Sequence, residues 1–145
     1  MKIILWLSLF LLLVAGATPV FGVVEDLQIE SVESVAEGRD FGRVGPYEKV
    51  VGRLTLSLDP EKERIVDLNR APRGSDGRVR FQADIYLLRP VNPERGRGTL
   101  FLEIPNRGGK AIVRYFNRGA IRTFDPVTSE SLGDGFLMEE GYTLA

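Results

Sequence analysis

The sequence predicts an α/β fold in which a β-rich N-terminal region leads into an alternating sheet of strands and helices. Residues 53–58 alternate apolar and polar side chains strictly, which is the pattern of a half-buried strand. Residues 99–104 form a nearly continuous apolar run, interrupted only by Glu103, as expected for a strand covered on both faces. A loop containing glycines follows, and residues 110–119 then show apolar positions at helical spacing.

The β-rich region comprises three predicted strands. The segment "VEDLQIESVESVAEG" at 24–38 alternates unevenly and predicts an edge strand or an extended lead-in. In 53–58, Leu54, Leu56 and Leu58 share one face, opposite Arg53, Thr55 and Ser57. In the third, 79–87, one face is predicted to carry Val79, Phe81, Ala83, Ile85 and Leu87. These strands precede the alternating part of the predicted sheet.

The segment "GDGFLMEEGYTLA" at 133–145 predicts a short helix followed by a buried strand. Asp134 can cap the helix, Gly141 can close it, and "YTLA" has the composition of a strand opening. An apolar strand with an unprotected edge invites aggregation, so we expect this strand to continue in a longer polypeptide. The predicted sheet is therefore incomplete at its C-terminal end.

The first 22 residues have the layout of a secretory signal peptide. Lys2 precedes an apolar stretch from Ile3 to Val14, and small residues surround Pro19. Cleavage fits after Ala17 or after Gly22, and we prefer the second. The prediction is a secreted or periplasmic protein without stable membrane association after cleavage. The alternative is a membrane anchor formed by residues 3–24.

The composition excludes several kinds of chemistry. The 145 residues carry a formal net charge of -1, which indicates no bulk attraction to nucleic acid. Cysteine is absent, which excludes disulfides and thiolate metal sites. Histidine is absent too, so these residues hold no Ser-His-Asp triad and no imidazole metal ligand. We expect neither a metal nor an organic cofactor.

Two motif-like stretches do not carry the chemistry they suggest. In "PNRGGKA", Ile104 stands where a phosphate loop needs its first glycine, and Ala111 where it needs Ser or Thr. The basic run "RAPRGSDGRVR" at 70–80 lacks interleaved aromatics and sits at a predicted turn, which favours a solvated hairpin tip over a nucleic-acid surface. No serine of residues 23–145 lies in a G-x-S-x-G elbow.

Several blocks, in order, carry a family resemblance. The blocks are "GRDFGRVGPYEKVVGR", "IVDLNRAPRGSDGRVRFQADIYLLRPVNPERGRGTLFLEIPNRGGK" and "GDGFLMEEGYTLA". This succession resembles the N-terminal portion of large, mostly bacterial secreted proteins called alpha/beta hydrolase domain-containing proteins. The resemblance covers nearly all of the chain from Gly38 onward.

The resemblance implies that residues 23–145 are the N-terminal part of an alpha/beta-hydrolase domain that is truncated here. It also implies that the full-length protein is a serine esterase acting on small-molecule esters. The nucleophile, acid and histidine would come later in the polypeptide. In such hydrolases, the loop after the third strand gives a backbone N–H to the oxyanion hole. Asn106, Arg107, Gly108 and Gly109 occupy the corresponding loop. An alternative for the loop is that its glycines merely turn the chain into the helix. An alternative for the whole chain is a non-catalytic secreted β-rich binding module.

Overall fold

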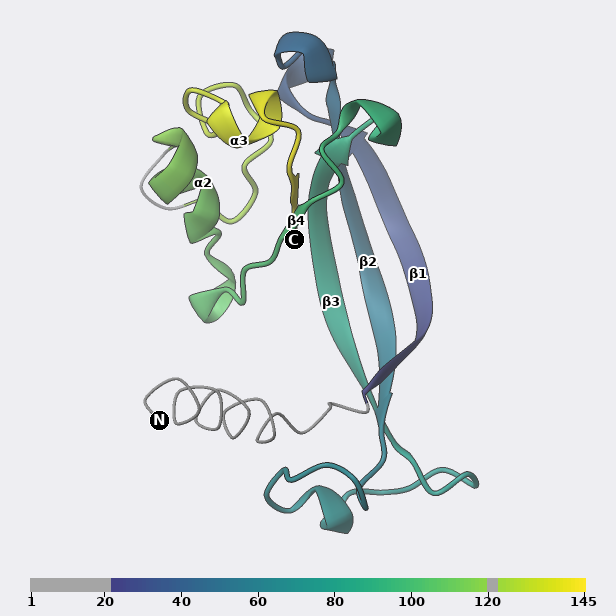
Figure 1. Ribbon diagram of the computed structural model, residues 1–145. Coiled ribbons are helices and arrows are strands. Elements are labelled where there is room, and N and C mark those ends of the chain that lie inside the picture. Colours follow the sequence, from purple (N-terminus) through teal and green to yellow (C-terminus); the bar gives the residue numbers. More distant parts are fainter. Residues whose placement is uncertain (1–21, 120–122) are drawn as a thin grey trace, which may run out of the picture. The chain divides into compact units, whose positions relative to one another are not determined.

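The protein is β-rich. A computed structural model describes residues 22–119 and 123–145 and contains a five-stranded sheet with the order β1-β2-β3-β5-β4 (Figure 1). Three strands of twelve residues come first: β1 (Val23–Ser34), β2 (Tyr47–Leu58) and β3 (Val79–Pro90). The other two, β4 (Leu100–Phe101) and β5 (Thr143–Leu144), have two residues each.

The helices are short. They are α2 (Ala111–Asn117), with seven residues, and α3 (Phe136–Glu139), with four. Single 3₁₀ turns complete the described elements: η1 (Ala36–Gly38), η2 (Gly42–Val44), η3 (Leu68–Arg70), η4 (Pro93–Arg95) and η5 (Asn106–Gly108).

The predicted α/β fold class is wrong. An alternating sheet needs helices long enough to cover its faces, and neither α2 nor α3 reaches the length usual for a crossover helix. The three consecutive long strands dominate, and the sheet is mixed, because β5 pairs antiparallel with β3 and parallel with β4. The predicted alternation rested on a strand, a loop and a helix between residues 99 and 119. In the structure, the strand and the helix are both shorter than the apolar pattern indicated.

The described residues group into two compact units. The first contains residues 22–25 and 55–81, and the second contains 26–54, 82–119 and 123–145. In the first unit, the basic run folds back on itself, with a bridge between Arg73 and Val79. Arg80 pairs with Asp76 at 2.6 Å and with Glu25 at 2.8 Å, and the hydrogen bond from Arg80 holds the pKa of the Asp76 carboxyl well below its usual range.

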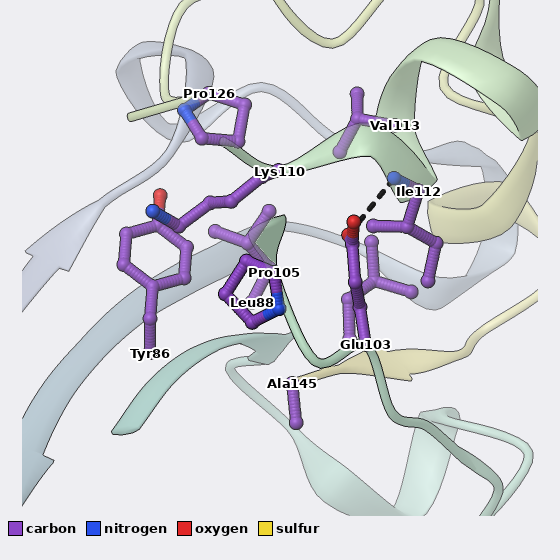
Figure 2. A pocket seen from close by; sticks show the side chains of 10 residues that line it. Tyr86, Leu88, Glu103, Pro105, Lys110, Ile112, Val113, Pro126 and Ala145 are labelled. Carbon is purple, nitrogen blue, oxygen red and sulfur yellow. Dashed lines mark hydrogen bonds between the residues drawn. The ribbon is translucent and has the colours of Figure 1, made fainter. Parts of the chain in front are cut away.

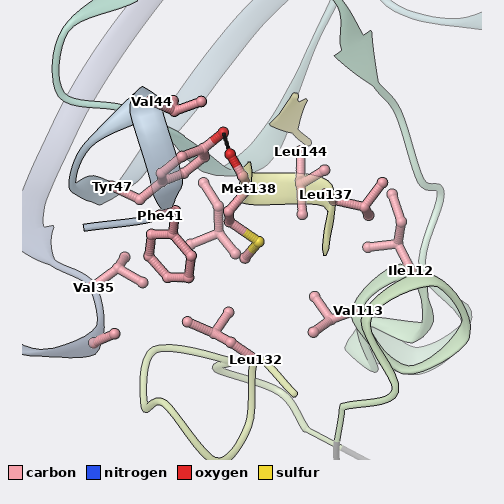
Figure 3. Packing of buried hydrophobic residues seen from close by; sticks show 12 residues of the cluster. Val35, Phe41, Val44, Tyr47, Ile112, Val113, Leu132, Leu137, Met138 and Leu144 are labelled. Atoms are coloured by element: carbon pink, nitrogen blue, oxygen red, sulfur yellow. Dashed lines mark hydrogen bonds between the residues drawn. The ribbon is translucent and has the colours of Figure 1, made fainter. Parts of the chain in front are cut away.

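The core of the second unit gathers residues that lie far apart in the sequence (Figure 3). Its members come from the segment between β1 and β2, from β2 and β3, and from the C-terminal third of the chain. They are Val35, Ala36, Phe41, Val44, Tyr47, Leu88, Ile112, Val113, Leu132, Leu137, Met138 and Leu144. Contacts between the N-terminal and C-terminal thirds therefore hold this unit together.

A buried amide links α2 to α3. Asn117 is fully buried, and its side-chain oxygen accepts the N–H of Leu137 at 2.9 Å. Its side-chain nitrogen donates to the sulfur of Met138 at 3.1 Å, and its carbonyl accepts the N–H of Asp134 at 2.7 Å. A β-carbon at Gly133 would lie 1.9 Å from that carbonyl, so the close approach of the two segments requires glycine there.

Several predicted elements are confirmed. β1 is an edge strand, and α2 occupies the predicted helical segment. The short helix α3 begins where expected, with the Asp134 carboxylate accepting the N–H of Phe136 at 3.1 Å. Arg118 follows the last residue of α2 and adopts the left-handed conformation, with φ 52°.

Predicted burial fails in all three strands. Within residues 53–58 of β2 the buried residue is Ser57, whose hydroxyl accepts a 2.7 Å hydrogen bond from Arg78, rather than one of the leucines. In β3, Val79 and Leu88 are buried although they belong to opposite faces of the strand, and Phe81, on the same predicted face as Val79, is exposed. In the run 99–104, Thr99, Leu100, Leu102 and Ile104 are exposed, with Ile104 at 91%, and Phe101 and Glu103 are half-buried. The run therefore has one covered face instead of two.

The predicted signal peptide and the alternative anchor lie almost entirely outside the described residues, which begin at Gly22. Among residues 22–119 and 123–145, no helix has the length and apolar character needed to cross a membrane.

Candidate functional site

The predicted oxyanion loop, Asn106 to Gly109, connects the strand segment that includes β4 to helix α2. Asn106, Arg107 and Gly108 are exposed, and Gly109 is half-buried. Arg107 has φ 55° and ψ 36°, and Gly108 has φ 76°. A left-handed conformation costs a residue with a β-carbon about 1 kcal/mol, and a glycine would avoid this cost.

Some backbone N–H groups of this loop donate hydrogen bonds to other described residues, and others do not. The N–H of Gly109 donates to the carbonyl of Asn106 at 3.4 Å, and that of Lys110 donates to Thr123 at 3.1 Å. Within the described ranges, no acceptor is found for the N–H of Asn106 or of Arg107. These two donors are therefore available to a bound group, whereas Gly109 is the weakest of the four predicted candidates.

Glu103 fixes the base of the loop. Its two carboxylate oxygens accept the N–H groups of Ala111 and Ile112, each at 2.9 Å. These are the first two residues of α2, whose leading N–H groups have no partner inside the helix. One carboxylate thus joins the end of the strand segment to the start of the helix and holds the two ends of the loop at a set separation.

A small cavity lies beside the loop (Figure 2). Its volume is about 30 Å³, which is room for roughly two water molecules. The lining is mainly apolar and includes Pro105 and Lys110, the residues that flank the loop. The full set is Tyr86, Leu88, Glu103, Pro105, Lys110, Ile112, Val113, Pro126, Leu144 and Ala145.

Lys110 is the cation of this cavity. Its ammonium nitrogen lies 4.1 Å from the centroid of the Tyr86 ring and donates a hydrogen bond to the carbonyl of Phe124. The side chain is half-buried, and this burial lowers its pKa below the ordinary lysine value. Burial also raises the pKa of the Tyr86 hydroxyl, which stays protonated at neutral pH.

Asp125 connects this cation to a second lysine. The Tyr86 hydroxyl donates to one Asp125 oxygen at 2.8 Å, and the ammonium of Lys49 lies 3.1 Å from the other. Burial raises the pKa of Asp125, but the hydrogen bonds from Tyr86 and Lys49 outweigh it, and the pKa lies below its ordinary value. Lys49 is also 2.7 Å from Glu33, and this hydrogen bond raises its pKa.

Comparisons of the chain with protein-family models, with curated proteins and with solved structures found no significant match.

Sequence reasoning singled out the loop but not the residues around it. Glu103 had one signal, because it is the single charge in an apolar run, and such a residue is expected to find a buried partner. Tyr86, Lys110 and Asp125 come together only through the tertiary fold, and no local pattern places them near one another. Within residues 22–119 and 123–145, no three acidic side chains gather closely enough to hold a metal ion.

Proposed function

We propose that residues 23–145 belong to a secreted serine hydrolase that acts on ester bonds of small molecules. In this proposal, the loop Asn106–Gly109 supplies a backbone N–H to the oxyanion. The observation that carries it is the exposed loop with two unused donors, at Asn106 and Arg107, held at its base by Glu103. The resemblance of several sequence blocks to the secreted hydrolases supports the same function.

The chemistry assigns a limited role to this chain. A serine oxygen attacks the ester carbonyl carbon, and the carbonyl oxygen becomes negatively charged in the tetrahedral intermediate. Fixed N–H donors stabilise that charge because they need no reorganisation when it develops. The serine and its base are assigned to other parts of the polypeptide, since the 145 residues contain no histidine and no serine elbow.

The first experiment treats the complete secreted polypeptide with a fluorophosphonate, which labels activated serines. We expect one labelled serine outside residues 23–145, together with hydrolysis of p-nitrophenyl acetate. A secreted polypeptide that is folded but neither takes the label nor hydrolyses the ester overturns the proposal.

A matched pair of variants then tests the loop. Arg107→Gly keeps the N–H and tolerates the positive φ, so esterase activity should be retained. Arg107→Val disfavours that conformation, and kcat should fall about 10²-fold, the usual cost of losing one oxyanion donor. Thermal unfolding of both variants separates this effect from loss of the fold. Equal kcat values for the two folded variants exclude the loop from the oxyanion site.

A specific observation favours a second candidate, a non-catalytic secreted β-rich binding module. β1 is an edge strand whose apolar side chains Leu27, Ile29 and Val32 are each about half exposed, at 45%, 50% and 51%. Exposed edge strands accept a further strand from a binding partner. An absence of both fluorophosphonate labelling and esterase activity would favour this candidate.

A further inference from the structure

The outer side of β1 offers backbone groups to another strand in the second unit, at residues 26–34. Among the strands of residues 22–119 and 123–145, β1 has β2 as its only neighbour (Figure 1). Just beyond β1, the N–H of Val35 donates to the carbonyl of Tyr47, the first residue of β2. Backbone groups alternate in direction along an extended strand, so those of Val32 and Ser34 point away from β2. Both residues are exposed.

Apolar side chains accompany these backbone groups, and the usual protection of an edge strand is missing. Leu27, Ile29 and Val32 are each about half exposed. A strand added at this edge would cover them with its own alternate side chains. Edge strands that stay unpaired are commonly protected by lysine or proline. The twelve residues of β1 contain no basic side chain and no proline.

The charge beside this edge is negative. Two cations of β2 each face two carboxylates, one from β1 and one from elsewhere in the second unit, at distances from 2.7 to 3.3 Å. Each trio therefore keeps one uncompensated negative charge, and the β1 carboxylate in each is about half exposed. Asp26 adds a further exposed carboxylate to β1. The first trio is Glu33, Lys49 and Asp125, and the second is Glu30, Arg53 and Asp84.

We propose that the outer edge of β1 binds an extended segment of a partner protein in which basic residues alternate with apolar ones. The backbone of the segment pairs with Val32 and Ser34, and its lysine or arginine side chains lie beside Glu30 and Glu33. A second copy of β1 fits less well, because it brings like charges opposite one another. The proposal rests on the second candidate function above, for which it names the partner, and it does not depend on hydrolase activity.

The test measures the binding of three fluorescent peptides to the full chain by anisotropy at low salt. The first peptide alternates valine and lysine, the second alternates valine and glutamate, and the third has the sequence of β1 itself. We expect the lysine peptide to bind at least about tenfold more tightly than the other two, because several opposite-charge pairs act together. Its affinity should fall as salt is added, since salt screens exposed charges.

The other outcomes overturn the proposal in distinguishable ways. Equal affinities for the lysine and glutamate peptides exclude a basic partner but leave strand binding, and with it the second candidate function, intact. Tightest binding by the β1 peptide makes a second copy of the chain the occupant. Binding by none of the three peptides overturns both the basic partner and the second candidate function.

Three variants separate backbone pairing from charge. Val32→Pro removes an N–H that faces outward, which an edge strand tolerates, so the folded variant should bind the lysine peptide at least about tenfold more weakly. Glu30→Gln should weaken that peptide about threefold, the loss of one cross-strand charge pair. Glu139→Gln removes the same charge from α3 and should have no effect. Unchanged affinity in folded Val32→Pro contradicts strand pairing. If Val32→Pro does not fold, Glu30→Gln and the peptide comparison decide the proposal.

Discussion

At the scale of single residues, the hydroxyl of Tyr47 is a buried donor that connects β2 to the C-terminal segment. It lies 3.1 Å from the carbonyl of Met138 (Figure 3). It also lies 2.9 Å from the carbonyl of Tyr142, and Tyr47 has no solvent exposure. The carbonyl of Met138 also accepts the N–H of Gly141 at 2.9 Å, so removal of the hydroxyl mainly affects the carbonyl of Tyr142. Loss of the donor to such an acceptor typically costs about 1–3 kcal/mol. We therefore expect Tyr47→Phe to lower the free energy of unfolding by about that amount, measured by urea denaturation.

The matched control is Tyr86→Phe. The Tyr86 hydroxyl also donates a hydrogen bond, but its acceptor Asp125 is exposed and water can replace the donor. Tyr86→Phe should therefore cost clearly less than Tyr47→Phe. Equal losses of stability in the two variants would show that burial of the acceptors does not set the cost.

At the scale of elements, Glu103 determines the start of α2. A helix of seven residues is marginal by itself, so the two N–H groups that Glu103 accepts are a large share of its stabilisation. Glu103→Ala should cost about 1 kcal/mol, as for loss of a helix cap. Hydrogen exchange at the amides of Ala111 and Ile112 should accelerate. Glu139→Gln, an exposed change on α3, is the control and should leave those amides unaffected, and unchanged exchange in Glu103→Ala would refute the capping role.

The positions of the helices and strands can be predicted from the sequence better than the faces that these elements bury. Asp134 and Gly141 predicted the ends of α3 because capping is a local interaction between neighbours in the chain. Burial depends on what packs against a strand, and the alternation around Ser57 cannot reveal that Arg78 covers it. The loop Asn106–Gly109 could be located from local signals, but its neighbours Tyr86 and Asp125 lie 39 residues apart and meet only after folding.

At the scale of the whole molecule, the sheet formed by residues 22–119 and 123–145 ends at β4, and no further strand of these residues pairs with the outer side of β4. The N–H of Glu103, the carbonyl of Phe101 and the carbonyl of Thr99 bond toward the segment of β5. The backbone groups of the alternate residues Leu100 and Leu102 consequently face away from the sheet. Their side chains are 56% and 65% exposed, so this edge offers both backbone donors and apolar contacts to another chain.

We expect the chain, expressed as residues 1–145, to self-associate through this edge, because unpaired apolar edge strands template further pairing. Leu102→Lys places a charge on the edge and should raise the monomer fraction, measured by sedimentation velocity. Val66→Lys is the matched control, because Val66 is 89% exposed but lies outside every strand. If both substitutions raise the monomer fraction equally, general surface apolarity rather than the β4 edge causes the association. If the unaltered chain is already monodisperse at high concentration, the edge does not drive association at all.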